Sequence, residues 1–372
     1  MSKHDKFSTN NLLKEKIFVG TETTTISKEE ANFIQEVLSE SAVEECGFEV
    51  SEIVKSLQLI DQNTECDSYS FTFDNKLFVL KINEDDPDNV LEREYNNLKL
   101  LKGKPISPIP SFFGRVNYSD SQVNILIVTL EASFSLFDIS ERQFFELLEP
   151  LAINLSFLHE FTQEARGNEA DLFLQAFLDD NDFEAIVPDD ILENFKTKIP
   201  NYSKCVEFLH LIKSEVTYEI KELEQSDFSL CHTNLTKSKI LLKNNFFKFI
   251  NFQQSFVLDP FFDLAFLCLS TGLCKSPSAE KTLLEKYFKH HRLLDLNIKD
   301  AEEKLKKFKN TCSKIVLARL SSEMVFELST HQNKRPNRML KMIKRYEYIR
   351  PQIQEAFPNH IELTDDFFYL FT

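Results

Sequence analysis

The chain has 372 residues, of which 42% are hydrophobic, so it is long enough to form two lobes or domains around a packed core. Its net charge of −16 argues against a nucleic-acid-binding protein, which needs a basic surface to meet the phosphates. No apolar run reaches about 18 residues, so no membrane span is expected, and the start does not resemble a signal peptide. The seven cysteines are scattered without a CxxC pair, which favours reduced thiols in a cytoplasmic protein.

Residues 1–49 are expected to form an N-terminal arm followed by one helix. The first 25 residues are polar and rich in Thr and Asn. Ser27 and Glu30 fit a capping box, and the apolar spacing from Ala31 to Leu38 predicts an amphipathic helix that ends near residue 41. We expect this helix to cover the domain that follows, with contact to a partner as the alternative.

Residues 50–131 have the pattern of a small, mainly antiparallel β domain. Strands are predicted at 52–60, 69–73, 77–82, 112–116 and 123–130. Asp74 and Asn75 mark a tight turn between the second and third of these strands. A helix is expected to begin at Val90.

Residues 132–372 are predicted to be mostly helical. Apolar periodicity indicates helices at 140–159, 203–225, 279–294, 298–328 and 337–356. A strand, turn and second strand interrupt them between residues 240 and 252. His159, at the end of the first of these helices, is expected to be a packed or capping residue rather than a catalytic one.

Three further segments of this domain carry unusual composition. The stretch from Glu160 to Glu193 contains eleven acidic residues and one Arg, which indicates a solvated face or, alternatively, a pocket for a cation. The basic segment 331–350 is expected to pair within the chain or stay solvated, with an anionic partner as the alternative. The aromatic tail, residues 367–371, is expected to be docked in a groove of this chain or of a neighbour.

The most informative stretch is 229–267. It contains His232-Thr-Asn-Leu-Thr-Lys-Ser-Lys239-Ile-Leu, then Ile-Asn251-Phe, then Asp259-Pro-Phe-Phe-Asp263-Leu-Ala. This order and spacing resemble the catalytic segment of the aminoglycoside phosphotransferase and choline kinase family, and the resemblance covers about residues 50–275. It implies a bilobal α+β fold of the protein-kinase type. The small β lobe would be 50–131, and the helical lobe with its C-terminal extension would be 132–372.

The resemblance also implies that the chemistry of this segment has been replaced. Asn234 stands where the family has the Asp that takes the substrate hydroxyl proton. Lys239 and Asn251 stand where it has the Asn and Asp that hold Mg²⁺. An amide cannot accept that proton, and general-base catalysis contributes ~10²–10⁴-fold. No catalytic residue is then intact, no metal is expected and the chain would be a pseudokinase.

Three retained residues are implied to be structural. His232 would hold the loop by hydrogen bonds, Asp263 would brace the loop backbone from the start of a helix, and Asp259 completes the same motif. This is the pattern expected when a fold is kept and turnover is not.

The nucleotide cleft is implied by four residues, Lys81, Glu94, Lys239 and Asn251. Lys81 matches the phosphate-contacting lysine of the family and Glu94 its carboxylate partner, with Glu92 as the alternative partner. A structural ion pair, or a solvent-exposed lysine and a routine helical glutamate, would give the same pattern.

The loop 61–68 argues against tight nucleotide binding. In the family this loop contains glycine and closes over the phosphates, whereas here it has three carboxylates and no glycine. We therefore expect no cofactor, with ATP bound without Mg²⁺ as the alternative. The Lys239 ammonium is expected to reach the metal position and neutralise either a phosphate or this loop, or else to point into solvent.

The sequence is compatible with three functions. The first is a non-catalytic kinase-like binding or scaffold protein, whose partner would be another protein. The second is a divergent ATP-dependent phosphotransferase that acts on a small cationic alcohol. The third is a nucleotide sensor without turnover.

Overall fold

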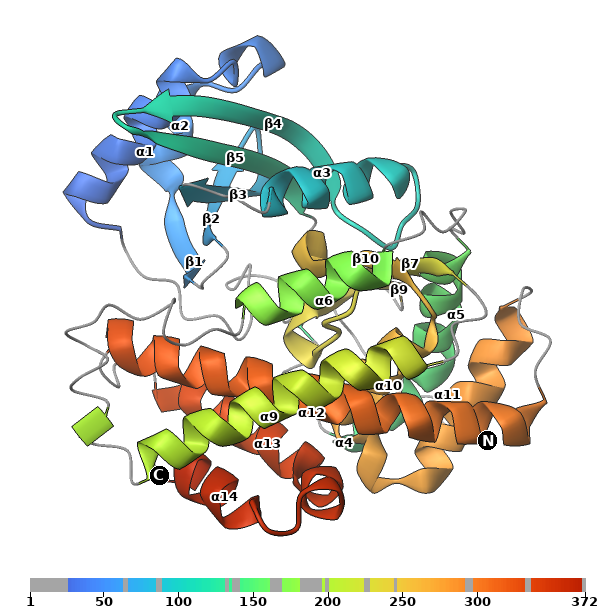
Figure 1. Cartoon of the computed structure of the whole chain (residues 1–372). Helices are drawn as coiled ribbons and strands as arrows, with labels where there is room; N and C mark the ends of the chain where they lie inside the picture. The colour runs from blue at the N-terminus through green and yellow to red at the C-terminus, as the bar shows by residue number, and fades with distance from the viewer. Residues whose placement is uncertain are drawn as a thin grey trace.

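A five-stranded antiparallel sheet and a larger set of helices form two lobes in the computed structural model, as Figure 1 shows. This arrangement confirms the bilobal α+β prediction. The structure describes residues 26–62, 66–84, 89–130, 134–135, 141–160, 169–180, 196–197, 201–223, 228–243, 246–291, 297–331 and 336–369.

The sheet of the small lobe is antiparallel throughout. Its strands, in spatial order, are β1 (Gln58–Gln62), β2 (Asp67–Phe73), β3 (Lys76–Glu84), β5 (Ser121–Leu130) and β4 (Ile109–Tyr118). Asp74 and Asn75 form the turn between β2 and β3 with φ values of 49° and 58°, the left-handed backbone that two-residue hairpins favour. The helix that follows β3 is α3 (Val90–Leu100).

The two faces of β3 meet different parts of the molecule. Phe78, Leu80 and Ile82 point to the core of the small lobe, whereas Val79 belongs to the core that continues into the large lobe. Side chains alternate along a strand, so Lys81 lies on the face of Val79. The register of β3 therefore directs this lysine toward the boundary between the lobes.

The predicted strand at 52–60 was wrong. Residues of α2 (Val50–Ser56) occupy most of it, and β1 begins only at Gln58. The buried side chains of Val50, Ile53 and Leu57 recur at intervals of three and four, which places them on one face of a helix rather than on alternate faces of a strand.

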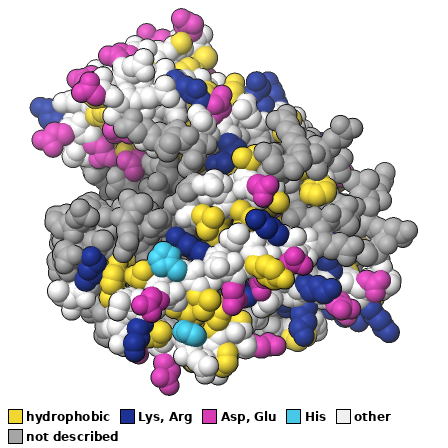
Figure 2. Space-filling model, in the orientation of Figure 1, with side chains coloured by type: hydrophobic (Ala, Val, Ile, Leu, Met, Phe, Trp, Pro, Cys, Tyr) yellow, Lys and Arg dark blue, Asp and Glu magenta, His cyan; other side chains and the backbone are white. Residues whose placement is uncertain are grey.

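The N-terminal helix α1 (Lys28–Glu40) is part of the small lobe. The Ser27 side chain accepts from the Glu30 amide at 3.1 Å, and Glu30 accepts from the Ser27 amide at 3.3 Å, so the capping box is confirmed. Ile34 and Leu38 pack in the core of the small lobe, and Figure 2 shows Asp and Glu side chains gathered on the outer end of this lobe.

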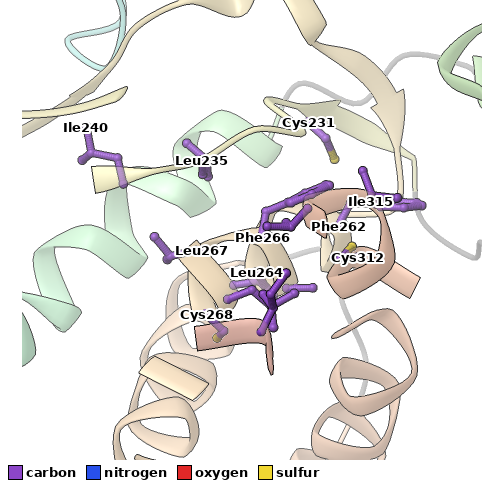
Figure 3. Packing of buried hydrophobic residues seen from close by; sticks show 14 of the residues in the cluster. Cys231, Leu235, Ile240, Phe262, Leu264, Phe266, Leu267, Cys268, Cys312 and Ile315 are labelled. Carbon is purple, nitrogen blue, oxygen red and sulfur yellow. The ribbon is translucent and has the colours of Figure 1, made fainter. Parts of the chain in front are cut away.

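Helices make up most of the large lobe. They are α4 (Glu141–Glu146), α5 (Leu148–His159), α6 (Glu169–Asp180), α9 (Tyr202–Glu222), α10 (Phe261–Thr271), α11 (Pro277–His290), α12 (Ile298–His331), α13 (Pro336–Ala356) and α14 (Ile361–Tyr369). Every residue of α10 is buried, and Figure 3 shows Phe262, Leu264 and Phe266 of this helix among the packed core side chains. Within the described residues, no helix is both long and apolar enough to cross a membrane.

The strands of the large lobe carry the segment singled out in the sequence. β7 (Ser229–Cys231) pairs with β10 (Phe256–Leu258), and β8 (Ile240–Lys243) pairs with β9 (Phe246–Phe249). We predicted that the second strand of the hairpin extends to Phe252, but β9 ends at Phe249. Asn251 has a left-handed backbone with φ of 65°, and the short helix η5 (Phe252–Gln254) follows it directly.

The aromatic tail docks on its own chain. In α14 the side chains of Phe367 and Phe368 are buried, and the Phe368 ring stacks on Tyr346 of α13 with centroids 4.2 Å apart. Arg350 and Asp365 form an ion pair at 2.6 Å across the same two helices. Phe367 and Phe368 of the tail therefore dock on this chain.

Two arginines of the basic segment form ion pairs with the helices around it. Arg350 meets Asp365 as above, and Arg345 of α13 meets Glu323 of α12 at 3.3 Å. The side chains of Lys334, Arg335 and Arg338 lie outside the described part of the chain.

The placement of α1 predicts that its apolar face contributes to the stability of the small lobe. Leu38→Ala should reduce the free energy of unfolding by ~2–5 kcal/mol, because it leaves a cavity in a fully buried position. Chemical denaturation measures this change, and Gln35→Ala on the exposed face of α1 is the matched control. Equal stability of both variants and the wild type would show that α1 does not pack on the lobe.

Candidate functional site

Asp263, at the start of α10, organises the loop that follows β7. Its two carboxylate oxygens accept from the backbone amides of His232 and Thr233, both at 2.7 Å. One of these oxygens also meets Nε2 of His159 from α5 at 3.1 Å. All four residues are buried, so the carboxylate exchanges water for three hydrogen bonds and holds the loop in one conformation.

Thr233 adopts a backbone that its side chain disfavours. Its φ is 55°, in the left-handed region where a β-branched residue is strained. The Thr233 hydroxyl donates to the carbonyl oxygen of Gln254, and Arg319 of α12 donates to the Thr233 carbonyl at 2.6 Å. Contacts from η5 and α12 therefore hold the loop in this shape.

Asn234 is buried and makes a hydrogen bond with another amide. Its Nδ2 donates to Oε1 of Gln254 at 2.7 Å. Neither side chain carries a titratable carboxylate, so neither can serve as a general base. We did not predict a role for Gln254, although two adjacent glutamines between Phe252 and Phe256 were a visible signal in an apolar stretch.

Lys81 lies between the two lobes. Its Nζ is 2.6 and 2.9 Å from the Glu94 carboxylate oxygens and 3.0 Å from Oδ1 of Asn251. Glu94 also accepts from the backbone amide of Phe252 at 3.0 Å. The side chains of Lys81 and Glu94 are 3% and 2% exposed, so their charges are balanced inside the protein rather than by solvent.

Glu92 is not the partner of Lys81. Its carboxylate pairs with Arg115 of β4, and the two side chains are 42% and 38% exposed. Of these two glutamates, only Glu94 lies on the face of α3 that meets the large lobe.

His232 is neutral and buried. Its Nε2 donates to the Ile250 carbonyl at 2.8 Å, and its ring lies against Phe252. Burial, with a contribution from the positive charge of Lys239, lowers the pKa of His232 to about 4. The imidazole therefore supports the loop and carries no charge near neutral pH.

Lys239 closes the short helix η4 (Lys237–Lys239) and is half-buried. Its carbonyl oxygen accepts from the Ile250 amide at 3.0 Å, which places its backbone beside the residue that precedes Asn251. Residues 63–65, the tip of the loop that we expected Lys239 to neutralise, lie outside the described residues. Asp67 and Ser68, which we assigned to that loop, belong to β2.

Asp259 is also buried and structural. It accepts from the Phe261 amide at 3.0 Å, at the first residue of α10, and pairs with Lys304 of α12 at 2.7 Å. It thus joins the start of α10 to α12 and is not a free carboxylate in the cleft.

The buried side chains of His159, Cys231 and Asp263 lie close enough together to suggest a metal site. However, His159 hydrogen-bonds through both ring nitrogens, to Asp263 and at 2.7 Å to the hydroxyl of Tyr287. Burial raises the pKa of the Cys231 thiol, which favours the protonated form that binds metals poorly. The cluster is better explained as part of the hydrogen-bonded core.

Much of the acidic stretch 160–193 is not described. Its central part forms α6, in which Phe173, Leu174 and Phe177 are buried in the core of the large lobe. Residues 161–168 and 181–195 lie outside the described residues, so the cation pocket stays a prediction.

The geometry around Lys81 predicts very different effects of two neighbouring substitutions. Glu94→Gln should reduce the free energy of unfolding by ~3–5 kcal/mol, because it leaves the buried ammonium without a countercharge. Glu92→Gln should change it by less than ~0.5 kcal/mol, since that side chain is exposed. Denaturant unfolding of both variants checks the difference, and similar losses would contradict the pairing.

The low pKa of His232 predicts a dependence of stability on pH. The unfolded imidazole takes up a proton near pH 6.5, whereas the folded one does so near pH 4. The stability is therefore intact above pH 6.5 and falls between pH 6.5 and 4, by up to ~1.4 kcal/mol per pH unit. Unfolding free energies at pH 7.5 and 5 should show this loss in the wild type and a smaller loss in His232→Gln. An equal loss in both would show that another group causes it.

Comparison with known proteins gives a likeness of fold. No family model matches the sequence, and the search of curated proteins found no match. Among solved structures, the amicoumacin kinase hAmiN in complex with AMP-PNP, Ca²⁺ and Ami has a TM-score of 0.52 and 12% identity, over 85% of this chain and 95% of that one. Choline kinase LicA from Streptococcus pneumoniae has a TM-score of 0.51 and 16% identity, over 87% of this chain and 99% of that one. The chain therefore has the bilobal fold of these small-molecule kinases.

Proposed function

We propose that this protein is a non-catalytic, kinase-like binding or scaffold protein. The observation that carries the proposal is the pair of buried amides at the centre of the site. The Asn234 side chain donates a hydrogen bond to the Gln254 side chain, and the Asn251 side chain accepts one from the Lys81 ammonium. Both stand where kinases of the resembling family have carboxylates, and neither amide supplies a base or a negative charge.

The residues at the implied metal position do not fit Mg²⁺. This ion prefers carboxylate oxygens in an octahedral arrangement and is bound through one or two of them together with phosphate oxygens. Here the oxygen of Asn251 is neutral and already accepts from the Lys81 ammonium at 3.0 Å. The Lys239 ammonium is a second positive charge in this part of the chain. Because phosphoryl transfer depends on metal-assisted charge stabilisation, we infer that turnover is absent.

A second candidate function is nucleotide binding without turnover. The Lys81–Glu94 ion pair is the observation that favours it, since this lysine matches the phosphate-contacting residue of the resembling family. The same pair also has a structural role, because Glu94 bonds the amide of Phe252 in the large lobe. Binding experiments, rather than the presence of the pair, separate the two functions.

The partner that we propose is another protein. A chain that keeps the fold and replaces the reacting groups acts through its surface, and the aromatic tail and part of the basic segment are already engaged within the chain. A small cationic ligand at the acidic stretch is the alternative, as for a phosphotransferase that acts on a cationic alcohol.

The proposal predicts no Mg²⁺-dependent consumption of ATP above background, with or without choline, ethanolamine or an aminoglycoside as acceptor. The physical reason is the absence of a base at Asn234 and of a charged ligand at Asn251. Coupled detection of ADP measures it, and Lys81→Met prepared in parallel reports contaminating activity. Turnover in the wild type that disappears in Lys81→Met would contradict the proposal.

Thermal melts with and without AMP-PNP distinguish a scaffold protein from a nucleotide sensor. A nucleotide that binds the folded chain raises its Tm, and a scaffold without nucleotide affinity shows no shift. The triple variant Asn234→Asp, Lys239→Asn, Asn251→Asp is the matched control. It should gain a Tm shift that requires Mg²⁺, because it restores the metal ligands.

A further inference from the structure

Side chains on one face of α3 form hydrogen bonds with the large lobe. Arg93 donates through Nε to the carbonyl of Gln253 at 2.9 Å, and Asn97 donates to the carbonyl of Ser255 at 3.3 Å. The Glu94 carboxylate accepts from the amide of Phe252 at 3.0 Å. Residues four apart lie on one face of a helix, so Arg93 and Asn97 reach the same turn of the large lobe.

Other parts of the small lobe bond the same stretch of the large lobe. Gln253 donates from its side chain to the sulfur of Cys66 just before β2, at 2.8 Å. The amide of Phe249 donates to the carbonyl of Ile106 at 2.8 Å. The Arg93 guanidinium also lies over the ring of Phe256, 4.8 Å from its centroid. These contacts converge on residues 249–256, which we name the interlobe turn.

The chemistry of these bonds makes separation of the lobes costly. Most acceptors and donors in the interlobe turn are backbone groups, which cannot rotate away to find new partners as side chains do. A typical internal hydrogen bond contributes ~1 kcal/mol net, and more when one partner is charged, as Arg93 is. Rotation of one lobe against the other would break several of these bonds together.

Enzymes that close around a substrate rely on hinges that absorb such rotations. Here the chain itself supplies the contacts that hold the lobes, from α3, from the approach to β2 and from the segment before β4. A bound nucleotide therefore has little closure left to drive, since a ligand shifts an equilibrium only by its differential affinity for two states.

We propose that the interlobe turn is a permanent clamp, which fixes the two lobes in one relative position whether or not a nucleotide is present. Its residues are Arg93, Asn97 and Gln253 together with the backbone of 249–256. The clamp does not depend on the proposed function, because it concerns the lobes and not the transfer of phosphate. If the protein proves to be an active enzyme whose lobes are fixed, the clamp is supported and only the proposed function is wrong.

The distance between two spin labels, one on each lobe, tests the clamp. Cys46 is the one exposed cysteine of the seven and lies in the small lobe. Glu285→Cys on the exposed side of α11 provides the second label, and Cys274→Ser removes a half-buried thiol. Pulsed electron paramagnetic resonance should give one narrow distance distribution, unchanged by AMP-PNP with or without Mg²⁺. A distribution that shifts with the nucleotide, or one that is broad from the start, would overturn the proposal.

Two double variants of the small lobe, one within the clamp and one outside it, provide the matched comparison. The double variant Arg93→Ala, Asn97→Ala should broaden the distribution or add a second distance. Glu92→Ala with Arg115→Ala, which removes an exposed ion pair between α3 and β4, should leave it narrow. No broadening in the first variant would also overturn the proposal.

If the double variant does not fold, hydrogen exchange of the wild-type protein tests the clamp instead. The clamp predicts that the amides of Phe249 and Phe252 exchange as slowly as those of the central strand β3, because both donate across the lobe boundary. Fast exchange of these two amides in an otherwise protected protein would contradict it.

Discussion

The buried ion pair between Lys81 and Glu94 is the constraint on which the centre of the molecule depends. A charge inside a protein must be matched, since an unpaired buried ion costs several kcal/mol. Glu94 meets this need and also bonds the amide of Phe252, while Lys81 reaches Asn251. The pair therefore joins β3, α3 and the large lobe, and its loss would disturb all three.

The polar side chains around the loop that follows β7 make their hydrogen bonds and ion pairs within the protein. Asp263 braces the loop through two backbone amides and His159, and Asp259 is engaged by Lys304. The Asn234 side chain of the same loop donates a hydrogen bond to the Gln254 side chain. Side chains that satisfy one another in this way stabilise the loop and leave little free chemistry in it.

The sequence predicted the parts of this structure that follow from local pattern and motif spacing. The capping box of α1, the turn at Asp74 and Asn75 and the long helices of the large lobe were visible in this way. The error at 52–60 came from reading an apolar stretch as a strand when its spacing was helical. The contacts of Gln254 and Arg319 depend on segments that meet only in three dimensions, and no local pattern could reveal them.

We propose that this site does not hold the catalytic metal of a phosphotransferase. Electron paramagnetic resonance of Mn²⁺, titrated into the protein with AMP-PNP, measures this directly. We expect the protein with AMP-PNP to bind no more Mn²⁺ than the free nucleotide does, because Asn251 and Lys239 supply no anionic ligand. A protein-bound Mn²⁺ signal that is lost in Asn251→Ala would contradict it.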